Sequence, residues 1–232
     1  MNKKILAIGA HPDDIEFGAG AILIKEAAKG HSIKMLILSR GESATNGTPE
    51  QREEESRQAA GVIGAEIAFL NFGGDSHIQN TTENAYALTK EIREYKPDIV
   101  LGPQTLLNQH PDHANVGSLV RNSCRFSRYG GIAELKDIPA HAVNSLFFFP
   151  STPNLDSRPD IYVDITDAKE AWEQVMHLHE SQMKTKKYSD ILLTMSHLWG
   201  MTIGVEYAWG LYKNDPLVLE SIFDVVQTSP KF

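Results

Sequence analysis

The segment ILAIGAHPDD, residues 5–14, joins an apolar run to a histidine, a proline and two aspartates. A short apolar run without alternating polar residues is typical of a strand that is covered on both faces of its sheet. The run ends too early for the core of a signal peptide or for a membrane span. We therefore expect a buried first strand at Ile5–Gly9 whose carboxyl end carries the polar residues.

Helix-like and strand-like segments alternate after this strand. Apolar residues recur at helical spacing from Ile15 to Ala27, after Asp13 or Asp14 as a helix cap, and Gly30 supplies a stop signal. Further strands are predicted at residues 33–38, 65–70, 97–103, 145–149, 161–165 and 219–226, and further helices at 49–61, 80–95, 112–124 and 168–178. Such alternation is typical of βαβ units. The sequence thus predicts an α/β protein, a Rossmann-like three-layer sandwich with a mainly parallel sheet, in a single domain over residues 1–232.

Composition excludes several classes of partner. The net charge of −8 argues against general binding to nucleic acid or to anionic membranes. Cys124 is the only cysteine in the sequence, so there is no internal disulfide and no cluster of cysteines to hold a metal. We therefore expect a cytoplasmic protein that has neither nucleic acid nor a membrane as its partner.

A second segment contains the same residue types as the first. It reads HPDH, residues 110–113, and it follows the strand predicted at 97–103. In open α/β sheets, ligands bind at the carboxyl ends of the strands. Right-handed crossovers place several of the loops there on one edge of the sheet. We therefore expect the two segments to line one pocket, although they lie far apart in the sequence.

Together, the two segments offer the ligands of a zinc site. Catalytic zinc takes three protein ligands, commonly imidazole nitrogens and carboxylate oxygens, and leaves a position for water. His11, Asp14 and His113 would supply these three ligands. Asp13 would then accept a proton from the water, and His110 would stabilise the oxyanion or protonate the leaving amine. The alternative, that the aspartates cap helices and the prolines begin them, explains either segment alone, but not both at one edge.

In combination, these motifs resemble those of the LmbE-like, PIG-L-type zinc deacetylases. That family has an early A-H-P-D-D segment and a later H-P-D-H segment, and both are present here without gaps. Further similar stretches are NGTPEQREEE at residues 46–55, YKPDIV at 95–100, ESQ at 180–182 and GVEYA at 204–208. The resemblance implies a hydrolase that removes the acetyl group from an N-acetylglucosamine conjugate. The sequence resembles most closely the bacillithiol-pathway enzymes, a subgroup of this family whose substrate is N-acetylglucosaminyl malate.

The resemblance also implies the roles of individual residues. The residues of the two segments keep the roles given above, with His11, Asp14 and His113 as zinc ligands. Arg52, in the third stretch, would contact the substrate near the metal. Iron(II) is an alternative occupant of such a site. The implied partner is a small amino-sugar conjugate, and homo-oligomers, including hexamers, are in keeping with the family.

Several residues outside the motifs carry expectations of their own. Arg40 follows the second predicted strand on the same edge of the sheet and is a further candidate for substrate contact. Trp209 and His197 depart from the subgroup pattern, which has glutamate and arginine there, and we expect both to fall in a region that faces the substrate or a neighbouring subunit. His177 and His179 are expected to be partly exposed helix residues without a role in the site.

Two alternative functions remain open. A metal-dependent phosphoesterase also uses sites of histidine and aspartate, commonly with two metals. A nucleotide-binding module would use the same kind of sheet. However, Gly18 and Gly20 lie within a predicted helix and not in the turn before it, where glycines cradle a phosphate. Close packing of that helix on the sheet explains them better.

Overall fold

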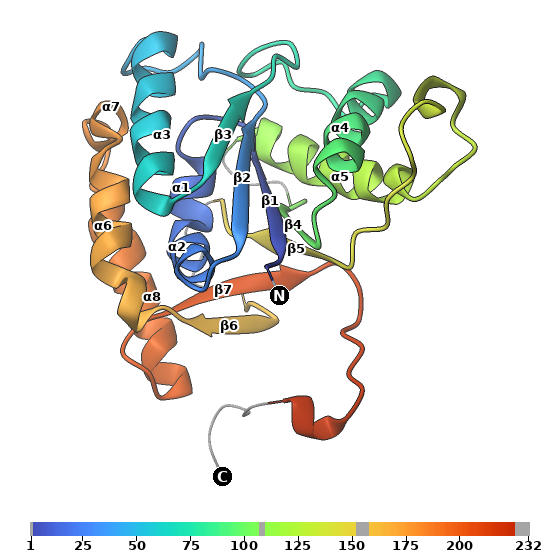
Figure 1. The fold of residues 1–232 in the computed structure, drawn as a ribbon. Helices are drawn as coiled ribbons and strands as arrows, with labels where there is room; N and C mark the ends of the chain where they lie inside the picture. The colour runs from blue at the N-terminus through green and yellow to red at the C-terminus, as the bar shows by residue number, and fades with distance from the viewer. Residues whose placement is uncertain (1, 107–109, 152–157, 226–232) are drawn as a thin grey trace.

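The computed structural model describes residues 2–106, 110–151 and 158–225, and it contains a seven-stranded sheet between layers of helices (Figure 1). The strands are β1 (Lys4–Gly9), β2 (Ser32–Ile37), β3 (Glu66–Phe69), β4 (Ile99–Pro103), β5 (Ser145–Phe149), β6 (Ile161–Asp164) and β7 (Ala208–Lys213). The α-helices are α1 (Asp14–Gly18), α2 (Gly20–Ala28), α3 (Pro49–Ile63), α4 (Thr82–Tyr95), α5 (Pro111–Ser127), α6 (Lys169–His177), α7 (Glu180–Met183) and α8 (Tyr188–Ile203). Short 3-10 helices are η1 (Ala133–Leu135), η2 (Thr166–Ala168) and η3 (Ile222–Asp224). The predicted α/β sandwich is confirmed.

The topology of the sheet brings the two motif segments together. The strand order is β3-β2-β1-β4-β5-β7-β6. The strands from β3 to β5 are parallel, and β7 runs antiparallel to both β5 and β6. The order changes direction between β1 and β4, which pair from Ile5↔Ile99 onward. The loops after these two strands therefore lie side by side at the carboxyl edge, where open α/β sheets bind ligands.

Two hydrophobic cores lie on the two faces of the sheet. Helices α2, α3, α6 and α8 cover one face, whereas α4 and α5 cover the other (Figure 1). Successive residues of β1 point to opposite faces, so that Ile5 and Ala7 pack into one core and Leu6 and Ile8 into the other. All four residues are buried. This explains why the first strand is an unbroken apolar run in the sequence.

The strand predictions fail near the C-terminus. Within residues 219–225 there is no strand, residues 222–224 form η3, and residue 226 lies outside the described residues. The segment is apolar, but none of the described strands pairs with it. Instead β7, which the sequence does not indicate, lies between β5 and β6. Its Gly210 touches Pro159, where a Cβ would clash, and a glycine inside a strand weakens the sequence pattern.

The helix predicted from Ile15 to Ala27 is in fact two helices, α1 and α2, which are separated at Ala19. The side chain of Asp13 makes no capping hydrogen bond, contrary to expectation. At the break, Gly18 lies directly on Phe149 of β5, and a Cβ at this position would clash with the ring. The predicted close approach of this segment to the sheet is therefore confirmed for Gly18.

Two buried tryptophans hold the break between α1 and α2 in place. Nε1 of Trp172 donates to the carbonyl of Glu16 at 2.9 Å, and Nε1 of Trp209 donates to the carbonyl of Gly18 at 2.6 Å. These bonds satisfy carbonyl groups at the end of α1 that have no partner within the helix. Trp209 is fully buried, so its own side chain faces neither the substrate nor a subunit, whereas the expectation for the region around it stays a prediction. The core thus fixes the short helix that begins at Asp14.

Helix α8 lies in a stretch where the sequence gives only weak signals. It packs against β7 and buries Leu192, Met195 and Trp199 in the first core. Neither α8 nor another helix in the described ranges is both long and apolar enough to cross a bilayer.

Candidate active site

A cavity of about 390 Å³ opens at the carboxyl edge of the parallel strands. Its lining comes from the loops that follow β1 to β5, and from α1, α3 and the region from α7 to α8. The predicted ligands, the predicted base and the predicted acid all line it, namely His11, Asp13, Asp14, His110 and His113. The two motif segments therefore meet in one pocket, as the sequence predicts.

The three predicted metal ligands form a buried group in this cavity. Nε2 of His113 lies 3.0 Å from Oδ1 of Asp14, and Nδ1 of His11 lies 3.6 Å from Oδ2 of Asp14. One ligand atom from each residue lies within 4.8 Å of the other two, which suits a single cation. The backbone N–H groups of Ala10 and His11 donate to Oδ2 of Asp14 at 2.8 and 2.9 Å. The HPDD loop thus holds its own carboxylate in place.

Two further aspartates orient His11, and the sequence does not indicate either for this role. Nε2 of His11 lies 3.2 Å from Oδ2 of Asp112 and 3.3 Å from Oδ1 of Asp75. The N–H of Ser76 donates to Oδ2 of Asp112 at 2.8 Å and keeps that carboxylate in position. Nδ1 of His11 therefore faces Asp14. A histidine that binds a metal commonly donates its other N–H to a carboxylate in this way.

The charges around the site fit a divalent cation. Four carboxylates lie within it, those of Asp13, Asp14, Asp75 and Asp112, whereas Arg52 is the only lysine or arginine that lines the cavity among the described residues. Burial lowers the pKa of His11, but the hydrogen bonds with Asp112 and Asp14 outweigh it and raise this pKa well above its usual value. The surroundings therefore favour positive charge, and the imidazole and carboxylate donors are those that zinc binds.

Asp13 lies beside the ligand group in a strained backbone conformation. Its φ of 117° lies in the region that favours glycine. Nη2 of Arg52 donates to Oδ2 of Asp13 at 3.1 Å and to the carbonyl of Pro12 at 2.7 Å. Burial raises the pKa of Asp13 to about 6, although the charge of Arg52 opposes this rise. A carboxylate with a raised pKa at this position is suited to accept a proton near neutral pH.

His110 stands at the other side of the cavity, at the start of α5. Its Nδ1 accepts from the backbone N–H of Asp112 at 3.3 Å, so this histidine, and not Asp112, caps the helix. Because that N–H can only donate, the hydrogen of the neutral ring lies on Nε2. Nε2 lies 3.4 Å from Oδ1 of Asp75. His110 therefore carries its N–H on the cavity side, where it faces the carboxylate of Asp75.

Known proteins match both the sequence and the fold of this chain. The family model of PIG-L, described as GlcNAc-PI de-N-acetylase, matches residues 6–124, just over half of the chain. This chain belongs to the PIG-L family. The diacetylchitobiose deacetylase of Thermococcus kodakarensis is 28% identical to it in an alignment 225 positions long that covers 90% of this chain and 82% of that protein. As a PIG-L member with such a relative, the chain is an N-deacetylase.

Two further proteins are similar to this chain, one in structure and one in sequence. The crystal structure of the conserved protein TT1542 from Thermus thermophilus matches with a TM-score of 0.84 and 28% identity, and it covers 94% of this chain and 97% of that one. The 4-oxalmesaconate hydratase of Pseudomonas putida is 26% identical in an alignment 216 positions long that covers 85% of this chain and 76% of that protein. Relatives of this PIG-L member therefore include both a deacetylase and a hydratase by name.

Three further residues carry expectations from the sequence for this PIG-L site, namely Arg52, Arg40 and His197. Arg52 lines the cavity, but its guanidinium donates to Asp13 and to two backbone carbonyls. Arg40 does not line it; its guanidinium pairs with Glu53 at 2.9 Å and with Glu50 at 3.1 Å on α3. The role of Arg40 in substrate binding stays a prediction that this geometry does not support. His197 is exposed, and its Nδ1 lies 2.8 Å from the carbonyl of Glu206.

His179 and Glu16 form a buried pair next to the site that the sequence does not indicate. Both side chains are fully buried, and Nε2 of His179 lies 3.4 Å from Oε1 of Glu16. The expectation that His179 is partly exposed is therefore wrong, whereas His177 is exposed. The ring of His179 packs edge-on against Phe17, which lines the cavity. The pair joins α1 to the start of α7 in this PIG-L fold.

Proposed function

We propose that this protein is a cytoplasmic, zinc-dependent hydrolase that removes the acetyl group from an N-acetylglucosamine-type sugar conjugate. The observation that carries the proposal is the group of three possible metal ligands, His11, Asp14 and His113, with the carboxylate of Asp13 beside them. Iron(II) is an alternative metal, since the same donors bind it. The relative that deacetylates diacetylchitobiose, by its name, supports an amino-sugar substrate.

The residues of the cavity divide the proton transfers between them. A divalent ion at His11, Asp14 and His113 would polarise the acetamide carbonyl and lower the pKa of water. Asp13 accepts the proton of the attacking water, and Arg52 holds its carboxylate in position. The N–H of His110 stabilises the oxyanion of the tetrahedral intermediate. The C–N bond then breaks, and the amine leaves with the proton that Asp13 took up, which restores this carboxylate. If His110 supplies the proton instead, Asp13 releases its own proton and His110 regains one from solvent.

Substitutions separate the base from the ligands. We expect Asp13→Asn to keep the metal and to lower kcat by about 10²–10⁴-fold, because only the proton acceptor is removed. His11→Ala should lose the metal together with the activity. Release of amine from N-acetylglucosaminides and metal analysis of the same samples measure both effects. His31→Ala, at the opposite end of β2, is the matched histidine control and should keep both. A fully active Asp13→Asn enzyme would exclude the assigned base.

The geometry disfavours the two alternatives from the sequence. A second group of possible ligands consists of His11, Asp75, His110 and Asp112. It shares His11 with the first group, and a histidine normally binds one ion through one ring nitrogen, so the two groups do not offer full ligand sets to two metals at once. A nucleotide-binding loop is disfavoured because Gly18 and Gly20 pack against Phe149 and Trp172. A metal content near one ion per chain supports the deacetylase.

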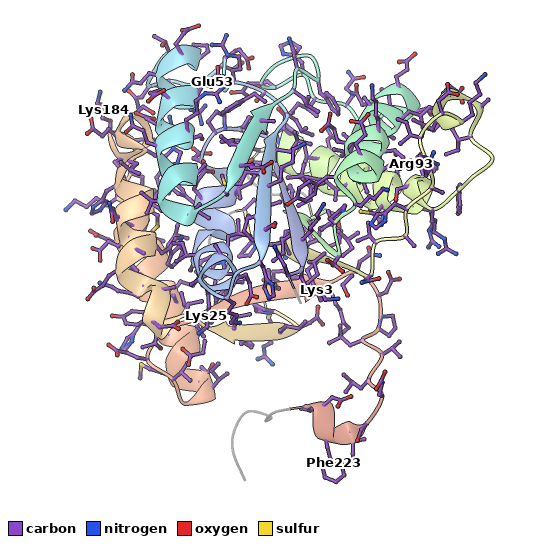
Figure 2. The ribbon with its side chains drawn as sticks, viewed as in Figure 1. Lys3, Lys25, Glu53, Arg93, Lys184 and Phe223 are labelled. Atoms are coloured by element: carbon purple, nitrogen blue, oxygen red, sulfur yellow. The ribbon has the colours of Figure 1, made fainter. Side chains whose placement is uncertain are left out.

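We further propose that the chain forms homo-oligomers, as the resemblance implies, up to a hexamer. Large exposed apolar residues gather in the C-terminal segment, namely Leu217, Val218, Leu219, Ile222, Phe223 and Val225. This segment extends away from the sheet, with Phe223 pointing outward at 88% exposure (Figures 1 and 2). Exposed apolar patches mark interaction sites. A second copy of the chain is the partner that we propose for it.

Size-exclusion chromatography with light scattering measures the mass of the protein in solution and tests this assembly. Ile222→Ser combined with Phe223→Ser should lower the measured mass, because it removes apolar area from the contact. Met201→Ser, an exposed apolar residue on α8, is the control and should keep the mass of the unchanged protein. If the unchanged protein is a monomer, the proposed assembly is excluded.

A further inference from the structure

The charges in the cavity are confined to one part of it. The aspartates, the histidines and Arg52 gather around the group formed by His11, Asp14 and His113. The other lining residues are uncharged, and the larger ones are Phe17, Thr45, Gln182, Thr185, Tyr188 and Leu192. We call these six residues the neutral wall. It comes mainly from α1, from the loop before α3 and from the region between α7 and α8.

We infer that the group attached to the amino sugar is an uncharged, hydroxyl-rich ring, such as a second sugar. Conjugates with a carboxylate or phosphate there, including the malate conjugate that the sequence resemblance implies, are then poor substrates. This inference rests on the proposed deacetylase function and adds the class of the attached group. An anion that enters a cavity loses hydration and needs a cation or several donors in return. The neutral wall contains no cation to offer in exchange.

Both terminal nitrogens of Arg52 are already engaged, and its Nε is buried. Its exposed fraction is 4%, and its Nη2 donates to Asp13 and to the carbonyl of Pro12, while Nη1 donates to the carbonyl of Gly41 at 3.3 Å. A negative group on the substrate would compete with Asp13 for this guanidinium. Because Asp13 is the proposed base, such competition would also disturb the reaction.

Other cations near the cavity do not line it. Lys184 lies on the outer side of the region around α7, at the edge of the molecule (Figure 2). Arg40 is paired with two glutamates of α3. The two internal stretches outside the described residues, 107–109 and 152–157, contain neither lysine nor arginine in the sequence. The carboxylates of the site, in contrast, repel a second negative charge.

The neutral wall has the surface that a sugar ring needs. The rings of Phe17 and Tyr188 lie side by side with centroids 5.6 Å apart, and they present apolar area to the C–H face of a pyranose. Thr185 accepts a hydrogen bond from Nδ2 of Asn46 at 2.8 Å, so its own hydroxyl hydrogen can be donated to a substrate hydroxyl. Polar groups of this kind orient a neutral ligand without charge.

The test compares matched substrates on the metal-loaded enzyme. The neutral conjugates are methyl N-acetylglucosaminide and N,N'-diacetylchitobiose, and the anionic ones are N-acetylglucosaminyl malate and N-acetylglucosamine 1-phosphate. We expect kcat/KM for release of amine to be about 100-fold higher for the neutral pair. A ratio of one or below would overturn the inference and leave the deacetylase intact. No release of amine from any of the four would instead overturn the proposed function.

A charge-changing variant tests the cause of the preference. Thr185→Arg places a cation on the neutral wall, and Thr185→Gln is its uncharged control. The ratio of kcat/KM for the malate conjugate to that for the methyl glycoside should rise about tenfold in Thr185→Arg relative to Thr185→Gln. The rise should shrink at 1 M salt, because salt screens charge. Equal ratios in the two variants would contradict the electrostatic explanation.

Discussion

At the scale of single residues, Arg93 shows how a buried charge organises backbone far from the site. It lies on α4, is 1% exposed and points into the region between α4 and α5 (Figure 2). Its guanidinium donates to the carbonyls of Phe126, Ser127, Tyr129, Leu135 and Ile138. These carbonyls belong to the end of α5 and to the turn region after it. One side chain thus satisfies acceptors that the helix end leaves without partners.

We expect Arg93→Met to lower the free energy of unfolding by about 3–5 kcal/mol, because several buried carbonyls lose a charged donor. Urea denaturation measures this loss. Arg121→Met, at an exposed position on α5, should change it by less than about 0.5 kcal/mol. The kcat of folded Arg93→Met protein should stay near the original value, since Arg93 does not line the cavity. Equal stability of the two variants would contradict this role.

At the scale of elements, α1 depends on partners that come from the far end of the chain. Trp172 lies on α6 and Trp209 on β7, and both donate to carbonyls of α1. The pair of Glu16 and His179 adds a third connection. Because α1 begins at Asp14, a shift of this helix moves a proposed metal ligand.

We expect Trp209→Phe to lower the free energy of unfolding by about 1–3 kcal/mol, because the carbonyl of Gly18 loses its donor. Its kcat should fall by about tenfold, since a small displacement of a reacting group is costly. Trp199→Phe is the matched control, because the side chain of Trp199 makes no hydrogen bond to α1 among the described residues and packs in the same core. A larger loss of kcat in Trp199→Phe would show that packing, and not the hydrogen bond, positions the helix.

Elements and site residues also differ in how well the sequence predicts them. Strands such as β1 are evident in the sequence because both their faces are buried in apolar cores. The proposed ligand residues are evident because a zinc site would use few residue types. Asp75, Glu16 and His179 are not evident, since each takes its role from a partner that only the fold brings near. Strand β7 is not predicted for a similar reason. A glycine is needed at position 210 because Pro159 lies too close for a Cβ, and this contact is not visible in the sequence.

At the scale of the whole molecule, the sheet connects both cores and the site, and we propose that the chain unfolds as one domain. Removal of the metal should then weaken the entire fold and not only the loops at the site. The reason is that carboxylates at the site would lose the cation that offsets their mutual repulsion. A ligand present at about 100 times its dissociation constant stabilises the folded state by roughly 2.7 kcal/mol.

We therefore expect a chelator to lower Tm as a single transition, and added zinc to restore it. Calorimetry of the two forms measures this shift. His11→Ala is the control, because chelator should leave its Tm unchanged. Two separate transitions, of which only one responds to the metal, would contradict the single domain.

The neutral wall has an evolutionary consequence. The proposed reacting groups lie between His11 and His113, in the part of the chain that the family model matches, whereas much of the wall follows β5. Gly130 and Gly131 lie between these parts, and a Cβ at either position would meet no atom within 4 Å. A chimera joined there would take its proposed reacting groups from one parent and much of its substrate preference from the other, provided that the second parent also supplies the two tryptophans that hold α1. Gene fusion and drift could therefore diversify substrates while the hydrolytic apparatus is conserved.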